Sequence, residues 1–252
     1  MRHAAVAYFE DGRPVQPETV LLTAEGREEA RAAAAMLEGI QFDRVITSGL
    51  PRTLETARIV VPDAEPESWP ELREIESGRL GDIPKDELER AFVEAWRDVV
   101  PEETKFLGGE TVGSLLDRVL AALDRLLADP DWDIVLAVLH GGVNRAIISY
   151  ALTGGRAMFG HLEQSPACIN VLDIGDDWIV RAVNTTPIDL AHRGSRLRTM
   201  EVLWSEFRPP GGASKTVRSP NIWYCQFAAI ANESSSKVIS PALRESSSSP
   251  DC

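Results

Sequence analysis

Two histidines, two arginines and a glutamate stand out in the sequence because their side chains together could act on an anionic group. Arg2 and His3 open the chain, Arg52 and Glu74 follow in its first third, and His140 precedes a pair of glycines. A histidine can act as a nucleophile, and a carboxylate can shuttle a proton. Arginines hold phosphate groups through two parallel hydrogen bonds. The set indicates an anion-binding site with a nucleophile and a proton shuttle beside it.

Short buried strands are expected to bring these residues to one edge of a sheet. Apolar runs at Arg44–Thr47 and Ile134–Leu139 predict two such strands. Ser48 ends the first strand and His140 the second, each directly before a predicted helix. In an open α/β sheet, ligands bind beyond the carboxyl ends of the strands, where helix N-termini offer free N–H groups to an anion. Both segments are therefore expected at the site.

The rest of the chain alternates helices with strands, which predicts a three-layer α/β/α sandwich with a mostly parallel sheet. Thr23 has the character of a helix N-cap. The spacing of apolar residues and the positions of turn-forming residues predict helices over Gly26–Leu37, about Arg52–Val60, near Lys85–Val99, Thr111–Ala128 and Val143–Leu152. They also predict a β-hairpin of Ile169–Ile174 with Trp178–Val183.

The amino-acid composition excludes several classes of protein. The chain has 252 residues and a formal net charge of -13, with a pI of about 4.8. An acidic body repels a phosphate backbone, so we expect no general nucleic-acid binding. No apolar stretch approaches the ~18 residues of a membrane span, and no signal peptide is evident. The three cysteines have no zinc-ligand spacing, which favours idle thiols in a reducing cytoplasm.

The C-terminal stretch differs from the rest of the chain. All of the net negative charge lies in residues 1–205, whereas residues 206–252 are close to neutral and rich in Ser and Pro. We expect one domain over residues 1–205 and a tail over 206–252 that is largely disordered. An apolar segment around 221–231 could still add a strand or cover an exposed face.

In order and spacing, several motifs resemble those of the histidine phosphatase superfamily, which has the phosphoglycerate mutase-like fold. The resemblance covers about residues 2–187. The family's Arg-His-Gly is matched by Arg2-His3-Ala4, and its Leu-Thr-x-x-Gly by Leu22-Thr23-Ala-Glu-Gly26. Its Ser-x-x-x-Arg-x-x-x-Thr-Ala segment is matched by Ser48, Arg52, Thr56 and Ala57, and its Leu-x-Glu by Leu72 and Glu74. Its Gly-Gly-Glu is matched by Gly108-Gly109-Glu110, and its second His-Gly-Gly by His140-Gly141-Gly142.

The resemblance implies a metal-independent phosphomonoesterase without a cofactor. His3 would attack phosphorus and become a phosphohistidine, and Glu74 would protonate the leaving alcohol. His140 would stabilise charge in the transition state. The residues implied to bind the substrate, a small phosphorylated metabolite or a phosphoprotein, are Arg2, Arg52, Ser48, Thr23 and Gly141.

The register to Leu72 and Gly78 selects Glu74 over its acidic neighbours Glu71 and Glu76. Glu110 is expected to cap the helix that follows it. Oligomeric state is left open by the sequence.

The chain departs from the family pattern at its start. Only Met1 precedes Arg2, where the family has a buried central strand, so the first strand is apparently missing from the sequence as written. We expect a chain extended upstream to be more stable and more active. Ala4 replaces the motif glycine, and Phe9 stands where the mutase branch has asparagine. The mutase branch's long insertion before Gly-Gly-Glu is also absent, which favours the phosphatase branch.

Two alternatives stay open. One is a phosphoglycerate mutase-like phosphotransferase, which would pass the phosphoryl group to a second hydroxyl rather than to water. The other is a non-catalytic protein that binds a phosphorylated ligand on the same fold.

Overall fold

A parallel sheet of three short strands forms the centre of the computed structural model, which describes residues 1–10, 13–188 and 198–207. β3 (Arg44–Thr47) lies between β4 (Glu67–Ser68) and β5 (Val135–Val138), and both pairs are parallel. The described residues all belong to the first of two units of the chain, residues 1–219 and 220–252.

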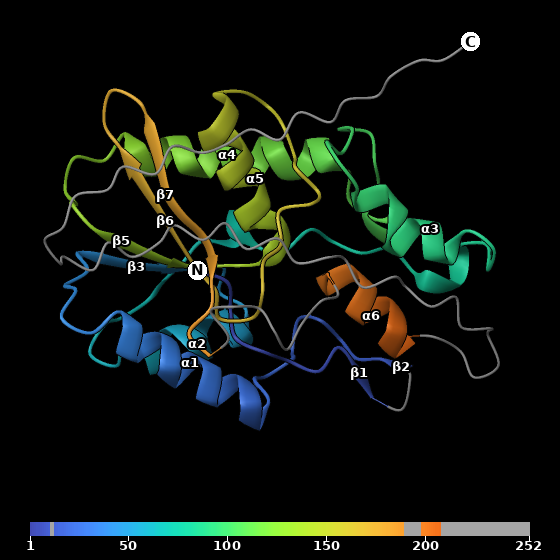
Figure 1. The fold of residues 1–252 in the computed structure, drawn as a ribbon, viewed down its shortest axis with the longest axis horizontal. Helices are drawn as coiled ribbons and strands as arrows, with labels where there is room; N and C mark the ends of the chain where they lie inside the picture. Colours follow the sequence, from blue (N-terminus) through green and yellow to red (C-terminus); the bar gives the residue numbers. More distant parts are fainter. Residues whose placement is uncertain (11–12, 189–197, 208–252) are drawn as a thin grey trace, which may run out of the picture. The chain divides into compact units, whose positions relative to one another are not determined.

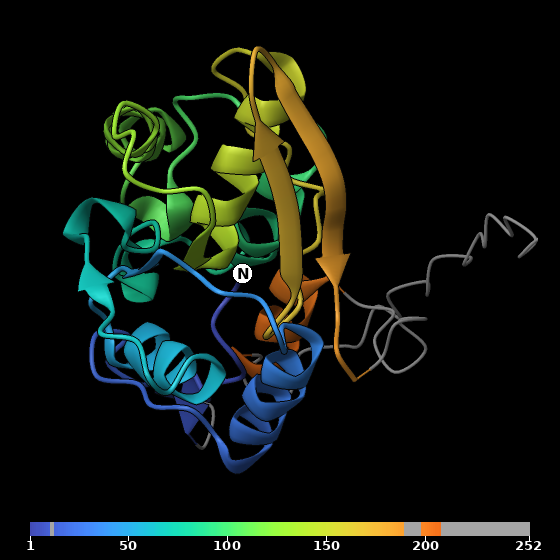
Figure 2. The ribbon, with the colours of Figure 1, turned by 90° about the vertical axis from the view of Figure 1, so that its left-hand side faces the viewer.

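Helices cover both faces of this sheet, as Figures 1 and 2 show. Successive strand residues point to opposite faces. Val45 and Leu136 pack into a core with the helices on one side, and Ile46 and Leu139 into a core on the other. The first layer holds α1 (Ala24–Met36) and α2 (Pro51–Val60), and the second holds α4 (Val112–Leu127) and α5 (Gly141–Thr153). The predicted three-layer α/β/α architecture is confirmed.

The chain start lies between the parallel sheet and a separate antiparallel hairpin. The hairpin consists of β6 (Ile169–Ile174) and β7 (Trp178–Thr185), as predicted. The backbone N–H of His3 donates to Leu139 O at 2.9 Å, and that of Arg2 donates to Cys168 O at 3.0 Å. A single bridge between Arg2 and Leu139 thus stands where the family has its first strand. The α-amino group of Met1 is buried here, which lowers its pKa to about 6.

The helix predicted near Lys85–Val99 is broken. α3 spans only Leu88–Phe92, and a 3₁₀ turn covers Glu94–Trp96. Beyond that turn, the backbone bonds to another loop: Gly160 N donates to Asp98 O at 2.8 Å. Val100 N likewise donates to Met158 O at 2.8 Å, so residues 98–100 bond to a distant loop and not within a helix. The remaining short elements are β1 (Phe9–Glu10), β2 (Arg13–Pro14) and 3₁₀ turns at Pro70–Leu72, Leu80–Asp82 and Phe106–Gly108.

A helix that the sequence analysis did not predict, α6 (Thr199–Phe207), packs on α3. The ring of Phe207 stacks on that of Phe92 at 5.5 Å between centroids, and Trp204 lies 5.5 Å from the same ring. α6 crosses the domain boundary predicted after residue 205. The rest of the predicted tail, including residues 221–231, lies outside the described residues, so the division of the chain stays a prediction.

Candidate active site

The predicted site residues gather at the carboxyl edge of the parallel sheet. Ser48 follows β3, His140 follows β5 and is the N-cap of α5, and His3 is bonded beside Leu139. Further bonds fix the segment after His3: Ala4 N donates to Thr56 Oγ1 at 3.1 Å. Thr56 is the threonine of the Ser-x-x-x-Arg-x-x-x-Thr-Ala segment, so that segment also positions the chain start.

The His3 side chain is buried and has one nitrogen directed at the site. Its Nδ1 lies 2.8 Å from Ala4 O, which can only accept a hydrogen bond, so Nδ1 carries the hydrogen and Nε2 presents its lone pair. Burial lowers the pKa of His3 well below 6.5, and the charges of Arg2 and Arg52 lower it further. His3 is therefore neutral near pH 7, the state required of a nucleophile.

His140 stands beside His3, with 5.2 Å between the ring centroids. Its Nε2 is 2.7 Å from Ser48 Oγ, and the Ser48 hydroxyl is fully buried. Ser48 thus orients the second histidine. Burial and the nearby charge of Arg52 hold the pKa of His140 well below its usual range.

Several side-chain nitrogens of the site are buried without a hydrogen-bond partner. Among the described residues, four buried side-chain nitrogens or oxygens lack a hydrogen-bond partner: Arg2 Nε, Arg52 Nε, His140 Nδ1 and Trp96 Nε1. Leaving a buried donor unpaired costs about 1–3 kcal/mol. Three of the four belong to residues predicted from the sequence to hold phosphoryl oxygens. An anion with several acceptor oxygens would satisfy them together.

Glu74 lies at the N-terminus of α5. Its two carboxylate oxygens lie 3.0 and 3.2 Å from the N–H of Gly142, which donates to them. A Cβ atom built on Gly141 would be 3.8 Å from Glu74 Oε2 and 3.9 Å from Arg2 Nε, so the carboxylate and the arginine face the same small volume. By contrast, Glu71 pairs with Arg125 on the surface.

Arg118 of α4 holds the loop that carries Glu74. Its guanidinium donates to the backbone oxygens of Glu71 and Arg73 at 2.6 Å each, and to Glu74 O at 3.2 Å. Glu110 fixes Arg118 with two hydrogen bonds of 2.8 Å. The expectation that Glu110 caps α4 is therefore wrong, because the N-cap is Thr111 and the carboxylate is turned to Arg118.

Thr23 and Gly141, both predicted to bind the substrate, differ in their contacts. The Thr23 hydroxyl accepts the N–H of Gly26 at 3.0 Å, which caps α1, and donates to Ala5 O at 3.4 Å. Gly141 opens α5 next to Arg2 and Glu74. Tyr8 was not predicted: its hydroxyl lies 3.3 Å from His3 Nε2 and its ring 5.9 Å from the Arg52 guanidinium carbon.

The profile of the histidine phosphatase superfamily (branch 1) matches residues 1–186. The chain belongs to this superfamily. Its site geometry follows the family motifs in order: an Arg-His at the sheet edge, an arginine at the start of α2, a glutamate loop and a second histidine before α5. In the described part of the chain, no group of three or more acidic, cysteine or histidine side chains could hold a metal ion.

The named relatives include phosphatases and phosphoglycerate mutase-like proteins. The chain is 30% identical over 179 residues to 2-carboxy-D-arabinitol-1-phosphatase of Triticum aestivum, covering 69% of this chain and 36% of that protein. It therefore spans only about a third of that relative's length. It is 27% identical over 177 residues to the adenosylcobalamin/alpha-ribazole phosphatase of Escherichia coli K12, covering 66% of this chain and 85% of the relative.

The solved structures agree in fold. A crystal structure described as a candidate alpha-ribazole-5′-P phosphatase from Escherichia coli superposes with a TM-score of 0.58 and 26% identity, covering 73% of this chain and 94% of that one.

No described helix of the present chain is long and apolar enough to cross a membrane.

Proposed function

We propose that this chain hydrolyses phosphomonoesters through a phosphohistidine formed on His3. The observation that carries the proposal is the group of three unpaired buried nitrogens, on Arg2, Arg52 and His140, around a neutral histidine whose Nε2 presents a lone pair. Two arginine donors and one imidazole nitrogen, left unpaired on residues close to His3, suit the several oxygens of a phosphoryl group.

In the first step, the lone pair of His3 Nε2 forms a bond to phosphorus, and the bond from phosphorus to the ester oxygen breaks. Arg2, Arg52 and His140 bind the phosphoryl oxygens and stabilise their charge in the transition state. The carboxylic acid of Glu74 gives its proton to the leaving alcohol. Because Nδ1 keeps its hydrogen bond to Ala4 O, the ring stays oriented while its charge changes.

In the second step, a water molecule replaces the alcohol. The Glu74 carboxylate takes one proton from the water as its oxygen bonds to phosphorus, and the bond from phosphorus to Nε2 breaks. Phosphate leaves, and His3 and Glu74 return to their initial protonation states. The arginines and the N-termini of α2 and α5 supply the positive charge for both steps.

The substrate class that we propose is a small phosphorylated metabolite, and a phosphoprotein is the second substrate class that we consider. Support comes from the named relatives, each described as acting on a small phosphate ester. The acidic composition argues against nucleic acid. We also infer a reducing, cytoplasmic setting, which the buried free thiol of Cys168 supports.

The test is phosphate release from a panel of phosphomonoesters in ¹⁸O-labelled water. We expect one labelled oxygen in the released phosphate, and a loss of at least about a hundredfold in rate for His3→Gln, given the 10²–10⁴-fold effects of such groups. His161→Gln is the matched control, because His161 is exposed and lies outside the site. Transfer to an added alcohol without labelled phosphate would favour the phosphotransferase. Phosphate binding without any turnover would favour a non-catalytic binding protein.

A further inference from the structure

Tyr8 places a hydroxyl group at the nucleophile, and neither step of the proposed reaction uses it. Its Oη lies 3.3 Å from His3 Nε2. Because His3 Nδ1 carries the ring hydrogen toward Ala4 O, Nε2 has only a lone pair to offer, so the phenol donates and Nε2 accepts. The hydroxyl of Tyr8 therefore binds the same lone pair that would attack phosphorus.

The ring of Tyr8 also contacts one of the arginines of the site. The guanidinium carbon of Arg52 lies 5.9 Å from the ring centroid, within the range of about 6 Å in which a cation is attracted to an aromatic face. Arg52 Nε is buried and has no partner among the described residues. Tyr8 thus lies against both the nucleophile and a residue proposed to hold phosphoryl oxygens.

The hairpin of β1 and β2 fixes the backbone of Tyr8. The N–H of Val15 donates to Tyr8 O at 2.9 Å, and Phe9 pairs with Pro14 directly beyond. After β2, the chain returns to the site, where Pro17 O accepts a hydrogen bond from an Nη of Arg52. The hairpin is therefore tied to the active site on both sides, at His3 through Tyr8 and at Arg52 through Pro17.

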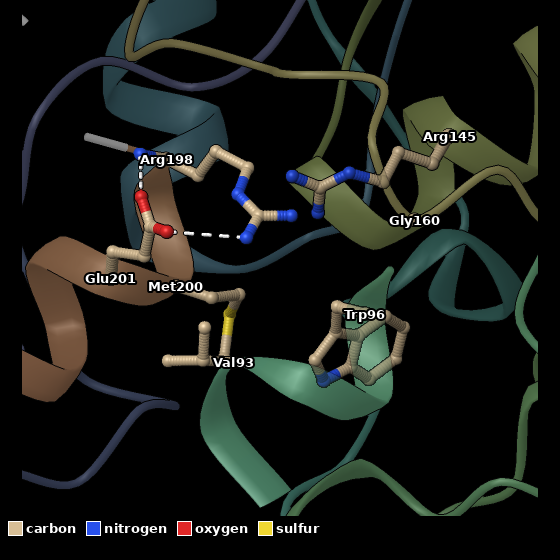
Figure 3. A pocket seen from close by; sticks show the side chains of 7 residues that line it. All are labelled: Val93, Trp96, Arg145, Gly160, Arg198, Met200 and Glu201. Carbon is tan, nitrogen blue, oxygen red and sulfur yellow. Dashed lines mark hydrogen bonds and ion pairs between the residues drawn. The ribbon is translucent and has the colours of Figure 1, made fainter. Parts of the chain in front are cut away.

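The helix α6 supports this hairpin from the outside. The ring of Phe9, next to Tyr8, lies 5.7 Å from the ring of Phe207 at the end of α6. At the start of the helix, Met200 is buried in the same core as Trp96, and the two line one small pocket (Figure 3). Packing on a well-filled core thus holds the hairpin, and the position of Tyr8 does not depend on its hydroxyl alone.

The hydroxyl of Tyr8 must change its acceptor during the reaction. When the lone pair of His3 Nε2 forms the bond to phosphorus, it no longer accepts from Tyr8. Reacting atoms stand about 3–3.5 Å apart before attack, and Tyr8 Oη is 3.3 Å from the same nitrogen. The oxygens on phosphorus are then the nearest acceptors. A hydrogen bond to a charged oxygen is about twice as strong as one between neutral groups, so this exchange favours the phosphorylated state.

We propose that Tyr8 is a further catalytic residue, whose hydroxyl donates to His3 Nε2 in the free protein and to a phosphoryl oxygen during transfer. The inference rests on the proposed phosphomonoesterase function and adds a donor to it. Tyr8 keeps its proton throughout. The leaving alcohol still receives its proton from Glu74, and the only covalent bonds that change are those to phosphorus and to the protons of Glu74 and water.

Tyr8→Phe tests the proposal, because it removes the hydroxyl and keeps the ring against Arg52. The probes are p-nitrophenyl phosphate for turnover and orthovanadate, which takes the five-coordinate geometry of a phosphoryl group in transfer, for binding. We expect Tyr8→Phe to lower kcat/KM about tenfold and to weaken inhibition by vanadate by a similar factor, the effect of one charge-assisted hydrogen bond.

Tyr150→Phe is the matched control. The ring of Tyr150 packs on Trp178 with 6.3 Å between centroids, and its hydroxyl has no hydrogen-bond partner in the part of the chain that the structure describes. We expect this variant to keep the kcat/KM and the vanadate affinity of the wild type.

Nuclear magnetic resonance of the free protein, labelled with ¹⁵N-histidine, tests the resting hydrogen bond separately. Tyr8→Phe should move the His3 Nε2 resonance toward that of a ring nitrogen without a hydrogen bond, and Tyr150→Phe should not move it. A purely structural role of Tyr8 would not produce this shift.

The outcomes separate the two proposals. An unchanged or higher kcat/KM in Tyr8→Phe, a loss equal to that in Tyr150→Phe, or an unchanged Nε2 resonance would overturn the role of Tyr8 and leave the phosphomonoesterase standing. If the wild-type chain hydrolysed no phosphomonoester of the panel, the proposed function itself would fall.

Discussion

At the scale of single residues, the site depends on nitrogens that the protein buries without partners. Arg2 and Arg52 are each at most 7% exposed, yet each keeps an Nε without an acceptor. Other contacts hold both side chains: an Nη of Arg52 donates to Pro17 O, and an Nη of Arg2 to Thr199 Oγ1. The donors are thereby oriented before a ligand arrives, which reduces the entropy lost on binding.

Replacement of Arg52 by lysine tests this orientation. Lysine keeps the charge but lacks the planar fork that bonds to two oxygens at once. We expect Arg52→Lys to weaken the binding of inorganic phosphate about tenfold or more, measured by calorimetry. Arg31→Lys, on the surface beside Glu28, is the control. Equal phosphate affinity in wild type and Arg52→Lys would contradict the role given to Arg52.

At the scale of elements, the N-terminus of α5 and the loop above it position the proton donor. The carboxylate of Glu74 lies so close to the helix that a Cβ on Gly142 would stand 2.5 Å from its Oε1. The glycine at that position is therefore needed for space, and Glu74 must move if the position gains a side chain.

Gly142→Ala is thus expected to lower kcat at least about tenfold while the protein stays folded, because only the proton donor is displaced. Gly155→Ala, just after the same helix, is the control: a Cβ there meets nothing within 4 Å. Circular dichroism and kcat measured together check the prediction. A Gly142→Ala enzyme with full kcat would show that Glu74 need not lie against α5.

Arg118 makes a second prediction at this scale. Its guanidinium binds three backbone carbonyls of the Glu74 loop, and methionine can replace its length but none of these bonds. We expect Arg118→Met to reduce kcat about tenfold or more with a smaller change in KM, since the proton donor loses its support. Arg125→Met, further along α4, serves as the comparison because Arg125 bonds to Glu71 and stacks on Trp69, with no bond to the backbone of the Glu74 loop among the described residues. Similar kcat losses in both variants would contradict the prediction.

At the scale of the whole molecule, two buried histidines couple stability to pH. The pKa of both His3 and His140 is well below 6.5 in the folded protein, mainly because of burial. In the unfolded chain, each takes up a proton near pH 6.5. Between these values the unfolded state binds more protons, so the free energy of unfolding falls as pH falls.

We therefore expect urea unfolding to show a loss of stability that begins near pH 6.5 and steepens on acidification, by up to about 1.4 kcal/mol per pH unit for each histidine. His140→Gln should reduce this slope, whereas His161→Gln should not. Stability that stays constant between pH 6.5 and 5 would mean that the two histidines take up protons equally in the folded and unfolded states, so that burial does not lower their pKa.

The sequence predicts those parts of the molecule that depend on local pattern. Apolar runs and capping residues locate β3, α1, α2 and α4, and the motif order predicts which histidines and arginines meet. The parts it does not predict depend on distant contacts. In the sequence, Arg118 does not differ from other charged residues of a helix. Only the folded structure shows the backbone carbonyls to which its guanidinium donates. The helix α6 depends on the contact between the rings of Phe92 and Phe207, which are far apart in the sequence.

The central claim is that His3 carries the phosphoryl group. The most direct measurement is a rapid-quench reaction with a ³²P-labelled phosphomonoester, stopped in base and followed by peptide mapping. We expect a base-stable, acid-labile label on the peptide that begins at Met1, formed and lost at rates that permit turnover, and absent in His3→Gln. Turnover with no label on that peptide, or a label that persists in His3→Gln, would contradict it.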